Sequence, residues 1–419
     1  MSTIASGPSH SLVGPRLSVM MFIQFFIWGA WYVTVGNYMS AHGMSDGIFW
    51  AYTVGPIAAI VSPFFLGMVA DRFFATERVL AVMHLLGGAA LLAAPTVARV
   101  QGETFWPFVV VLLVHMLCYM PTLGLTNTLA FHNMTNQEKQ FPLIRVFGTI
   151  GWIVANWVVS RGFAADRTDT QFYVAGGAAV LLGLFSLSLP HTPAPAADQK
   201  ASWRNILGID ALALMKDRSF AVFIISSFLI CIPLAAYYAY APVFAAAMGF
   251  ENTAFYMSFG QISEIFFMLA MPLCFVRLGV KWMLLIGMLA WVLRYGFFAA
   301  AADDQIRWMV LTGIILHGIC YDFFFVTGQI YVDKKATREI RGQAQGFLVL
   351  ITQGVGMLIG AQVFGRIVNT CTHEEARLRE GDWQTVWLIP CLAAAIVMIA
   401  FALLFRDNSA RSSGPYSIE

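Results

Sequence analysis

Long apolar segments recur along nearly the whole chain, and they restrict its fold more than any other feature of the sequence. A helix that crosses a bilayer needs about 20 mostly apolar residues, and the chain contains twelve segments of this kind. They lie near residues 17–40, 48–70, 79–98, 105–130, 142–160, 171–189, 219–248, 254–276, 282–301, 308–331, 342–365 and 384–405. We therefore expect an all-α integral membrane protein with twelve transmembrane helices.

The composition agrees with a chain surrounded by lipid. Hydrophobic residues make up 59% of the sequence and charged residues 11%, whereas a soluble domain carries about 25% charged residues. The net charge of +2 is too small to suggest a nucleic-acid partner. The six cysteines are scattered and form no CxxC pair or metal-type Cys/His spacing, so we expect no disulfide framework, metal or other cofactor.

The longest polar interruption divides the segments into two sets of six. We expect an N-terminal six-helix half (1–190), a cytoplasmic linker (191–217) and a C-terminal six-helix half with a short cytoplasmic tail (218–419). Lysines and arginines concentrate in the loops on the side of both termini, which the positive-inside rule places in the cytoplasm. This layout looks like the major facilitator fold, in which two halves rock about a site near the membrane midplane.

The loop after the second segment carries a motif that fits this fold. The stretch "GMVADRFFATER" resembles the superfamily's Gly-x-x-x-Asp-Arg loop. Gly67 would allow close helix packing, Asp71 would cap or pair with a helix end, and Arg72 would hold the cytoplasmic face. An ordinary positive-inside loop is the alternative.

Glycines at close spacing occur inside two segments. Gly148 and Gly151 lie in "IRVFGTIGW", and Gly356 and Gly360 lie in "GVGMLIGAQVFG". Small residues let helices approach closely in lipid, so we expect these glycines to serve helix packing and not phosphate binding.

Four ionisable residues lie inside predicted spans, where such residues are functional candidates. They are Arg145, Glu264, Arg294 and Asp322. Gln261 precedes Glu264 by three residues, so both project from one helix face. An amide beside a carboxylate suits recognition of hydroxyl groups or base edges, and a polar clamp between helices is the alternative.

Asp322 is the candidate for proton coupling. A carboxylate that alternates between its charged and neutral forms as access changes can link proton movement to transport, whereas a static salt bridge to Arg145 or Arg294 is the alternative. His317 and Tyr321 precede Asp322 and share a face at a spacing of four. Arg145 could instead extend to the headgroups, and we expect Arg294 to be a structural partner of a carboxylate.

The first segment adds an amide and aromatic rings. In "QFFIWGAWYV", Gln24 and Trp28 share a helix face at a spacing of four. An aromatic ring there can stack on a planar heterocycle or on the flat face of a sugar, although most such residues in membrane proteins serve packing or interface anchoring.

Several longer stretches carry a resemblance to a known family. "QFFIWGAWYVTVGNYM", "LGMVADRFF", "YMPTLGLTNTLAF", "FPLIRVFGTIGW", "QISEIFF", "YDFFFVTGQIYV", "RGQAQGF" and "DWQTVWL" run nearly end to end through the chain. They resemble the nucleoside:proton symporter family of the major facilitator superfamily. The resemblance implies a proton-coupled importer of nucleosides in the bacterial inner membrane, and not an enzyme. We expect a monomer that meets only its small-molecule substrate, protons and lipid.

The resemblance also assigns roles to individual residues. The family's pocket arginine and threonine match Arg145 and Thr149, and an aromatic residue follows at Trp152. Its glutamine and glutamate on helix eight match Gln261 and Glu264. Its helix-ten aspartate, which is tied to proton coupling, matches Asp322, beside the aromatic Tyr321.

Three positions depart from the family's pattern. A glutamine and an asparagine on helix seven correspond here to Ala235 and Tyr238, and a tyrosine shortly before the helix-ten aspartate corresponds to His317. We expect Tyr238 and His317 to contact the substrate. Because two amides are lost, a related riboside, a sugar or a polyol stays an alternative substrate, and an exporter of the same fold stays an alternative direction.

Overall fold

The described residues of the chain are helical segments joined by short connections. The computed structural model describes residues 12–65, 73–100, 104–194, 209–337, 340–371 and 382–406. The predicted loop-motif residues Gly67, Asp71 and Arg72 lie outside these ranges.

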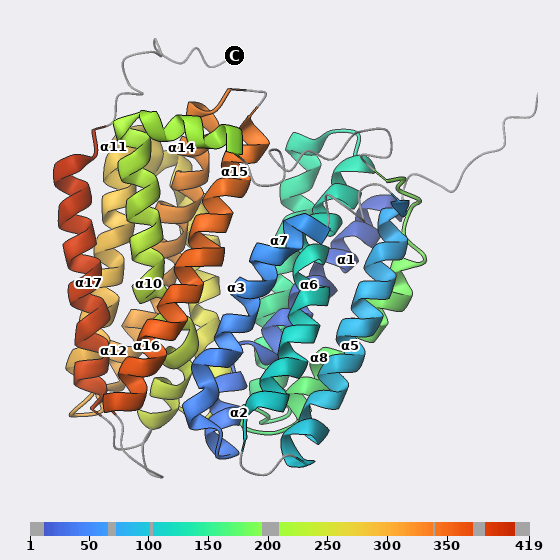
Figure 1. The fold of residues 1–419 in the computed structure, drawn as a ribbon, viewed down its shortest axis with the longest axis horizontal. Helices are drawn as coiled ribbons and strands as arrows, with labels where there is room; N and C mark the ends of the chain where they lie inside the picture. Colours follow the sequence, from blue (N-terminus) through green and yellow to red (C-terminus); the bar gives the residue numbers. More distant parts are fainter. Residues whose placement is uncertain are drawn as a thin grey trace, which may run out of the picture. The chain divides into compact units, whose positions relative to one another are not determined.

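The chain divides into two compact units (Figure 1). Unit 1 comprises Met1–Tyr38 and Val61–Lys200, and unit 2 comprises Met39–Ile60 and Ala201–Glu419. Two of the points at which the chain passes from one unit to the other lie within the helices α2 (Val35–Ala41) and α3 (Ile48–Phe65).

Five long helices form most of unit 1. They are α1 (Val13–Trp31), α5 (Thr76–Val100), α6 (Trp106–His132), α7 (Gln137–Trp157), which continues into the π-helix η4 (Val158–Gly162), and α8 (Thr170–Ser186). α1 packs against α7 and α8, and α5 packs against α6 and α8. At Gly151, a Cβ atom would overlap the carbonyl oxygen of Phe22, so α1 and α7 are in backbone contact.

Unit 2 contains the remaining helices. They are η2 (Ser45–Gly47), most of α3, η5 (Ile209–Lys216), α10 (Arg218–Ala247), α11 (Thr253–Ala301), α12 (Arg307–Ile315), α13 (His317–Cys320), the π-helix η6 (Tyr321–Val326), α14 (Thr327–Lys335), α15 (Arg341–Val349), the π-helix η7 (Leu350–Gly356), α16 (Met357–Cys371) and α17 (Trp383–Leu404). α10 packs against α16 and α17, and α11 packs against α12, α13 and α17. Gly356 lies at the contact of η7 with α10 and Gly360 at the contact of α16 with α10, so the predicted packing role is confirmed for them as for Gly151.

The helices account for all twelve predicted spans. Ten helical stretches in the described part of the chain are long and apolar enough to cross a membrane, and α8 is a shorter apolar helix. One of the ten, α11, has 49 residues and contains a non-helical residue, Gly279, at φ 68° and ψ 175°. Residues with a side chain rarely adopt such a φ value, so Gly279 ends one span (253–278) before the next begins (280–301). The predicted all-α fold with twelve membrane helices is confirmed.

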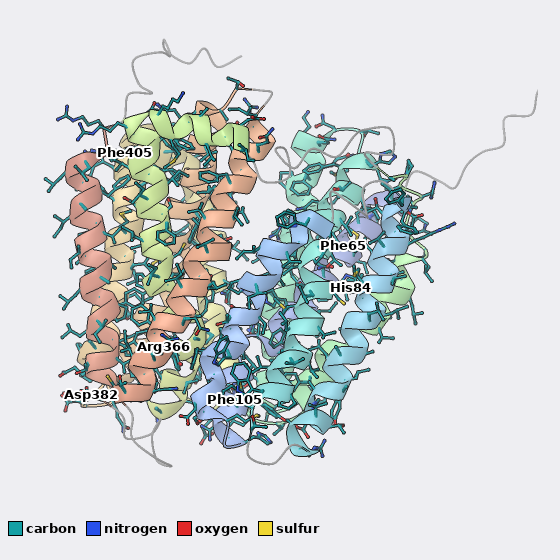
Figure 2. All side chains as sticks on the ribbon, viewed as in Figure 1. Phe65, His84, Phe105, Arg366, Asp382 and Phe405 are labelled. Carbon is teal, nitrogen blue, oxygen red and sulfur yellow. The ribbon has the colours of Figure 1, made fainter. Side chains whose placement is uncertain are left out.

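Apolar side chains cover the outward faces of long helices, as expected for a protein surrounded by lipid. On α17, Leu392, Ile396 and Leu403 are 55%, 68% and 74% exposed. Figure 2 shows carbon-only side chains projecting along the length of this helix. A soluble monomer rarely exposes so continuous an apolar surface.

Asp217 caps α10 and ties it to α14. Its Oδ1 accepts hydrogen bonds from the backbone N–H groups of Ser219 (2.8 Å) and Phe220 (3.1 Å), and its Oδ2 accepts one from Lys335 Nζ at 2.8 Å. The Lys335 hydrogen bond is the largest cause that lowers the pKa of Asp217 below its ordinary value, and the two backbone donors add to it.

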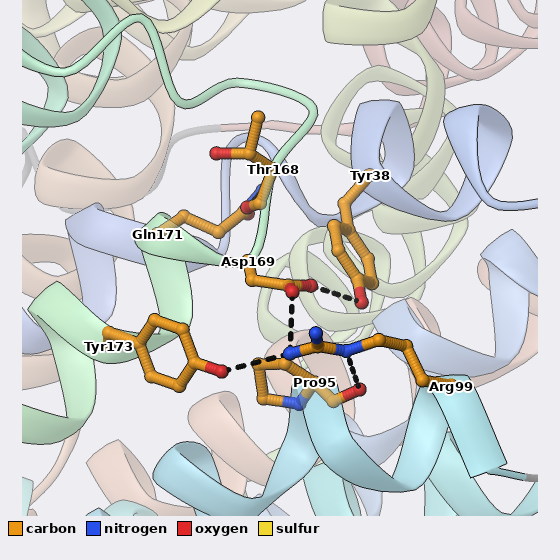
Figure 3. A network of polar contacts seen from close by, with 7 residues as sticks. All are labelled: Tyr38, Pro95, Arg99, Thr168, Asp169, Gln171 and Tyr173. Atoms are coloured by element: carbon orange, nitrogen blue, oxygen red, sulfur yellow. Dashed lines mark hydrogen bonds and ion pairs between the residues drawn. The ribbon is translucent and has the colours of Figure 1, made fainter.

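A polar network joins three helices of unit 1 (Figure 3). Arg99 on α5 pairs with Asp169 at 2.8 Å and donates to the hydroxyl of Tyr173 at 3.1 Å. The buried Tyr38 on α2 donates its hydroxyl hydrogen to Asp169 Oδ1 at 2.9 Å. Asp169 stands just before α8, so one carboxylate connects α2, α5 and the start of α8.

Candidate functional site

The aromatic candidates of unit 1 form one cluster at the contact between α1 and α7. The ring of Trp28 lies 5.5 Å from those of Tyr32 and Trp152, in edge-to-face geometry with both. Such pairs are favoured by the ring quadrupoles. Trp28 and Trp152, predicted from different helices, are therefore neighbours.

Arg145 lies at the same contact between helices. Its guanidinium carbon is 4.2 Å from the centroid of the Phe25 ring on α1, a cation–π geometry. A Cβ at Gly148 would come within 2.7 Å of Arg145 Nη1 and of Phe25 Cδ2, so glycine at this position leaves the space that the guanidinium occupies. Thr149 follows directly and is half-buried, as is Arg145 itself.

Gln24 is held inside unit 1 by hydrogen bonds. Its Nε2 donates to Thr122 Oγ1 at 2.7 Å, and His84 Nε2 donates to its Oε1 at 2.8 Å. The hydroxyl of Tyr119 donates to its backbone carbonyl at 2.6 Å. The Gln24 side chain is fully buried, so its amide joins α1, α5 and α6, with His84 on α5 visible in Figure 2. These partners could not be predicted from sequence spacing, because they lie on separate helices.

In unit 2, the first half of α11 packs directly on α13. A Cβ at Gly318 would lie 2.5 Å from the carbonyl carbon of Ser263 and 2.6 Å from the backbone nitrogen of Glu264. Ser263 donates its hydroxyl hydrogen to the carbonyl of Ile315 at 2.6 Å and accepts from the N–H of Gly318 at 3.0 Å. This contact brings the Glu264 backbone against the segment that carries the helix-ten candidates.

Arg294 has different partners from those predicted. Its Nε donates to the carbonyl of Gly313 at 3.1 Å, and its Nη2 lies 3.2 Å from His317 Nδ1. Its guanidinium carbon lies 4.0 Å from the ring centroid of Tyr237. Arg294 is fully buried, and within the described ranges no carboxylate lies at ion-pair distance from it. Its partners are thus a carbonyl, an imidazole and an aromatic face.

Asp322 is a fully buried carboxylate on the π-helix η6. Neither of its carboxylate oxygens has a hydrogen-bond partner within the described part of the chain. It lies close enough to Glu264 for the two carboxyl groups to interact electrostatically. Single π-helical turns are rare and occur often at functional sites, and this one begins at Tyr321.

His317 stands between aromatic rings. The Tyr321 ring is 6.0 Å away and the Tyr238 ring is 6.2 Å away, nearly perpendicular to the imidazole. Gln261, half-buried on α11, lies one turn before Glu264. Unit 2 therefore brings Glu264, His317, Tyr321, Asp322 and Tyr238 into one neighbourhood. Unit 1 does the same for Trp28, Arg145, Thr149 and Trp152.

The family model described as nucleoside H+ symporter matches residues 12–410 of this chain. The chain belongs to the nucleoside:H+ symporter family. The family predicted from the sequence motifs is thereby confirmed.

Relatives of this symporter match it over nearly its whole length. The putative nucleoside transporter YegT of Escherichia coli strain K12 is 40% identical over 404 residues, which cover 94% of each chain. The nucleoside permease NupG of the same strain is 34% identical over 414 residues, which cover 94% of this chain and 96% of the permease. A crystal structure of the nucleoside transporter NupG matches with a TM-score of 0.83 and 32% identity, over 94% of this chain and 99% of that one.

Membership of the family settles the class of protein. The nucleoside:H+ symporter is a multi-pass membrane transporter of the major facilitator fold, and its relatives are transporters and not enzymes. The residues that the sequence did not predict as a group are Tyr237, Arg294 and His317. No spacing rule could have found them, because they come from three separate helices.

Proposed function

We propose that this symporter imports nucleosides together with protons by alternating access, and that Asp322 carries the coupling proton with Glu264 beside it. The observation that supports this most is the unpartnered, fully buried carboxylate of Asp322. An isolated carboxylate in an apolar environment is very costly while it is ionised. A group in that position is therefore driven to exchange protons whenever water reaches it.

The proposal assigns substrate contacts to residues of each unit. The residues assigned to substrate binding are Gln24, Trp28, Arg145, Thr149, Trp152, Tyr238, Gln261, Glu264, His317 and Tyr321. They supply planar rings that can stack on a base and donors and acceptors that can hold a ribose. The two buried hydrogen bonds of the Gln24 side chain within unit 1 favour an indirect role for it, through the position of α1.

The paired test compares two carboxylates. Asp322→Asn keeps the size of the side chain but cannot titrate, so it should lose accumulation against a gradient and the acid stimulation of uptake while it still binds nucleoside. Glu264→Gln should weaken binding first. Binding is measured by calorimetry, and proton-driven uptake is measured in proteoliposomes.

The control is Asp303→Asn, because Asp303 is exposed in a connection and hydrogen-bonds Gln384. This variant should transport as the wild type does. An Asp322→Asn protein that still concentrates nucleoside from an acidic outside would show that coupling lies elsewhere.

The substrate class and the direction of transport need separate measurements. A thermal-shift screen against nucleosides, nucleobases, sugars and polyols should give stabilisation by nucleosides, because anything that binds the folded state raises its melting temperature. Stabilisation by sugars or polyols alone would favour the alternative substrates. Inverted vesicles distinguish import from export by the direction in which a proton gradient drives the substrate.

We further propose the membrane arrangement predicted from the loop charges. The symporter would lie as a monomer in the bacterial inner membrane, with halves 1–190 and 218–419 joined by the 191–217 linker, and with both termini and the linker in the cytoplasm. Single cysteines at Ser202 or Ser412, in an otherwise cysteine-free protein, should resist an impermeant thiol reagent in intact cells. Efficient labelling from outside would reverse the orientation.

A further inference from the structure

The contact between Arg294 and His317 fixes which imidazole nitrogen carries a hydrogen. Nη2 of Arg294 lies 3.2 Å from His317 Nδ1. A guanidinium stays protonated in proteins and has five donors and no acceptor. His317 Nδ1 must therefore accept, and in the neutral ring the hydrogen is on Nε2. The tautomer thus follows from the chemistry of the partner and not from a hydrogen position.

The surroundings hold both groups in this arrangement. Tyr237 presents its ring to the guanidinium at 4.0 Å and lies nearly parallel to the imidazole, with centroids 5.5 Å apart and 16° between the planes. Arg294 is also anchored by its hydrogen bond to the carbonyl of Gly313. On the other side, a Cβ at Gly260 would lie 3.0 Å from His317 Cβ, so α11 packs closely against the helical turn that carries His317. These contacts hold the imidazole and the guanidinium in their present positions.

The second nitrogen of His317 has no such partner. Within the described ranges no hydrogen bond is made by Nε2, and the ring lies between Tyr238 and Tyr321. Both tyrosines are only half-buried, whereas Arg294 is fully buried behind the imidazole. The side of the ring away from Arg294 is thus the side of the candidate substrate residues.

We infer that Arg294 is a positioning residue that fixes His317 as the Nε2–H tautomer, so that the site offers the substrate a permanent hydrogen-bond donor at this position. This inference rests on the proposed function for its ligand, a nucleoside. It assigns to His317 an acceptor atom of that nucleoside, which is a ring nitrogen, a carbonyl oxygen or a ribose oxygen. A substrate group that can only donate is disfavoured there, because two donors would face each other.

The tautomer can be measured without any substrate. Solid-state NMR of the ¹⁵N-histidine-labelled symporter, with the His317 signals assigned by their loss in His317→Gln, should show an unprotonated Nδ1 and a protonated Nε2. Arg294→Met removes the donor but keeps an unbranched side chain, and should give a mixture of tautomers or the Nδ1–H form. Arg294→Lys keeps a positively charged donor group that cannot accept a hydrogen bond, and should restore the Nε2–H form.

Two results would overturn the inference. A protonated Nδ1 in the wild type would overturn it even if neither Arg294 variant folds. An unchanged tautomer in a folded Arg294→Met protein would also overturn it, because a purely structural arginine would leave the imidazole as it was.

A binding series then tests the donor. In His317→Gln, the side-chain amide can place an N–H near the position of Nε2, so affinity for a nucleoside should stay within about threefold of the wild type. His317→Leu has no donor and should lose about tenfold, or 1.4 kcal/mol. The 3-deaza, 7-deaza and 2′-deoxy analogues of a nucleoside each lack one acceptor atom. One of these analogues should bind the wild type more weakly than the unmodified nucleoside does. The same analogue and the unmodified nucleoside should bind His317→Leu equally well.

The two proposals fail in different ways. If no nucleoside binds the wild type, the proposed function fails, and the NMR result still decides the tautomer. If nucleosides bind and His317→Leu binds them as well as the wild type, the donor role is wrong while the proposed function stands.

Discussion

Gly151→Ala tests the backbone contact between α1 and α7, which positions Arg145 and the tryptophan pair. The added Cβ would overlap the carbonyl oxygen of Phe22 and lie 2.9 Å from its carbonyl carbon, whereas ordinary contacts begin at 3.4 Å. A backbone carbonyl cannot rotate away, so the helices must separate. Overpacking costs about 1–3 kcal/mol, and we take the upper end. The better helix propensity of alanine returns about 1 kcal/mol, which leaves about 2 kcal/mol of net destabilisation.

The assay is thermal unfolding in detergent, followed by intrinsic tryptophan fluorescence. With about 2–4 °C per kcal/mol for a unit of this size, the melting temperature should fall by roughly 4–8 °C. Gly177→Ala is the matched control, since Gly177 is in α8 of the same unit and has nothing within 4 Å of a built Cβ. It should melt at or slightly above the wild-type temperature. A Gly151→Ala protein as stable as the control would refute the backbone contact.

Three further predictions follow from individual contacts. Gly148→Ala should weaken nucleoside binding by about tenfold, because the guanidinium of Arg145 and the ring of Phe25 must both move. Its melting temperature should fall less than that of Gly151→Ala, because the nearest atoms belong to side chains and not to the backbone. Calorimetry and thermal unfolding check the two parts. The hydrogen bond from Lys335 lowers the pKa of Asp217 in the folded protein. The stability that Asp217 contributes is therefore complete above its unfolded-state pKa and is lost as the pH falls through its folded-state pKa. The difference in melting temperature between the wild type and Asp217→Asn should shrink below about pH 4. Asp169→Ala should lower the melting temperature more than Asp169→Asn, since asparagine keeps an acceptor oxygen for the Tyr38 hydroxyl and alanine removes this hydrogen bond, which is worth about 1 kcal/mol. Equal melting temperatures would contradict this.

The fold and the family could be predicted from the sequence, because both depend on the composition and motifs of local segments. Apolar length marks a membrane span wherever it occurs, and Gly279 falls between two predicted spans that the structure shows as one helical stretch with a break. Glycine pairs at helical spacing also marked close packing correctly at Gly151 and Gly360.

The partners of polar residues could not be predicted in the same way. An amide at the position of Gln24 has the same periodicity whether it faces a cavity or a histidine on a neighbouring helix. Only its hydrogen bonds to residues of α5 and α6 in the folded unit distinguish the two. Arg294 was expected beside a carboxylate because buried charges are usually paired with opposite charges. It lies instead beside His317 and Tyr237. The π-helical turn at Asp322 has no residue-type signal, since it depends on backbone hydrogen bonds and not on side-chain pattern.

The contact at Ala235 has an evolutionary consequence. Ala235 is 1% exposed, and a Cβ at Gly360 would lie 2.7 Å from its own Cβ. A longer side chain at position 235, including an amide able to read a base, would need room beside this helix contact. Position 360 cannot compensate, because glycine is already the smallest residue. Residues 235 and 360 are thus expected to change together, because a Cβ at position 360 would need space that Ala235 already occupies.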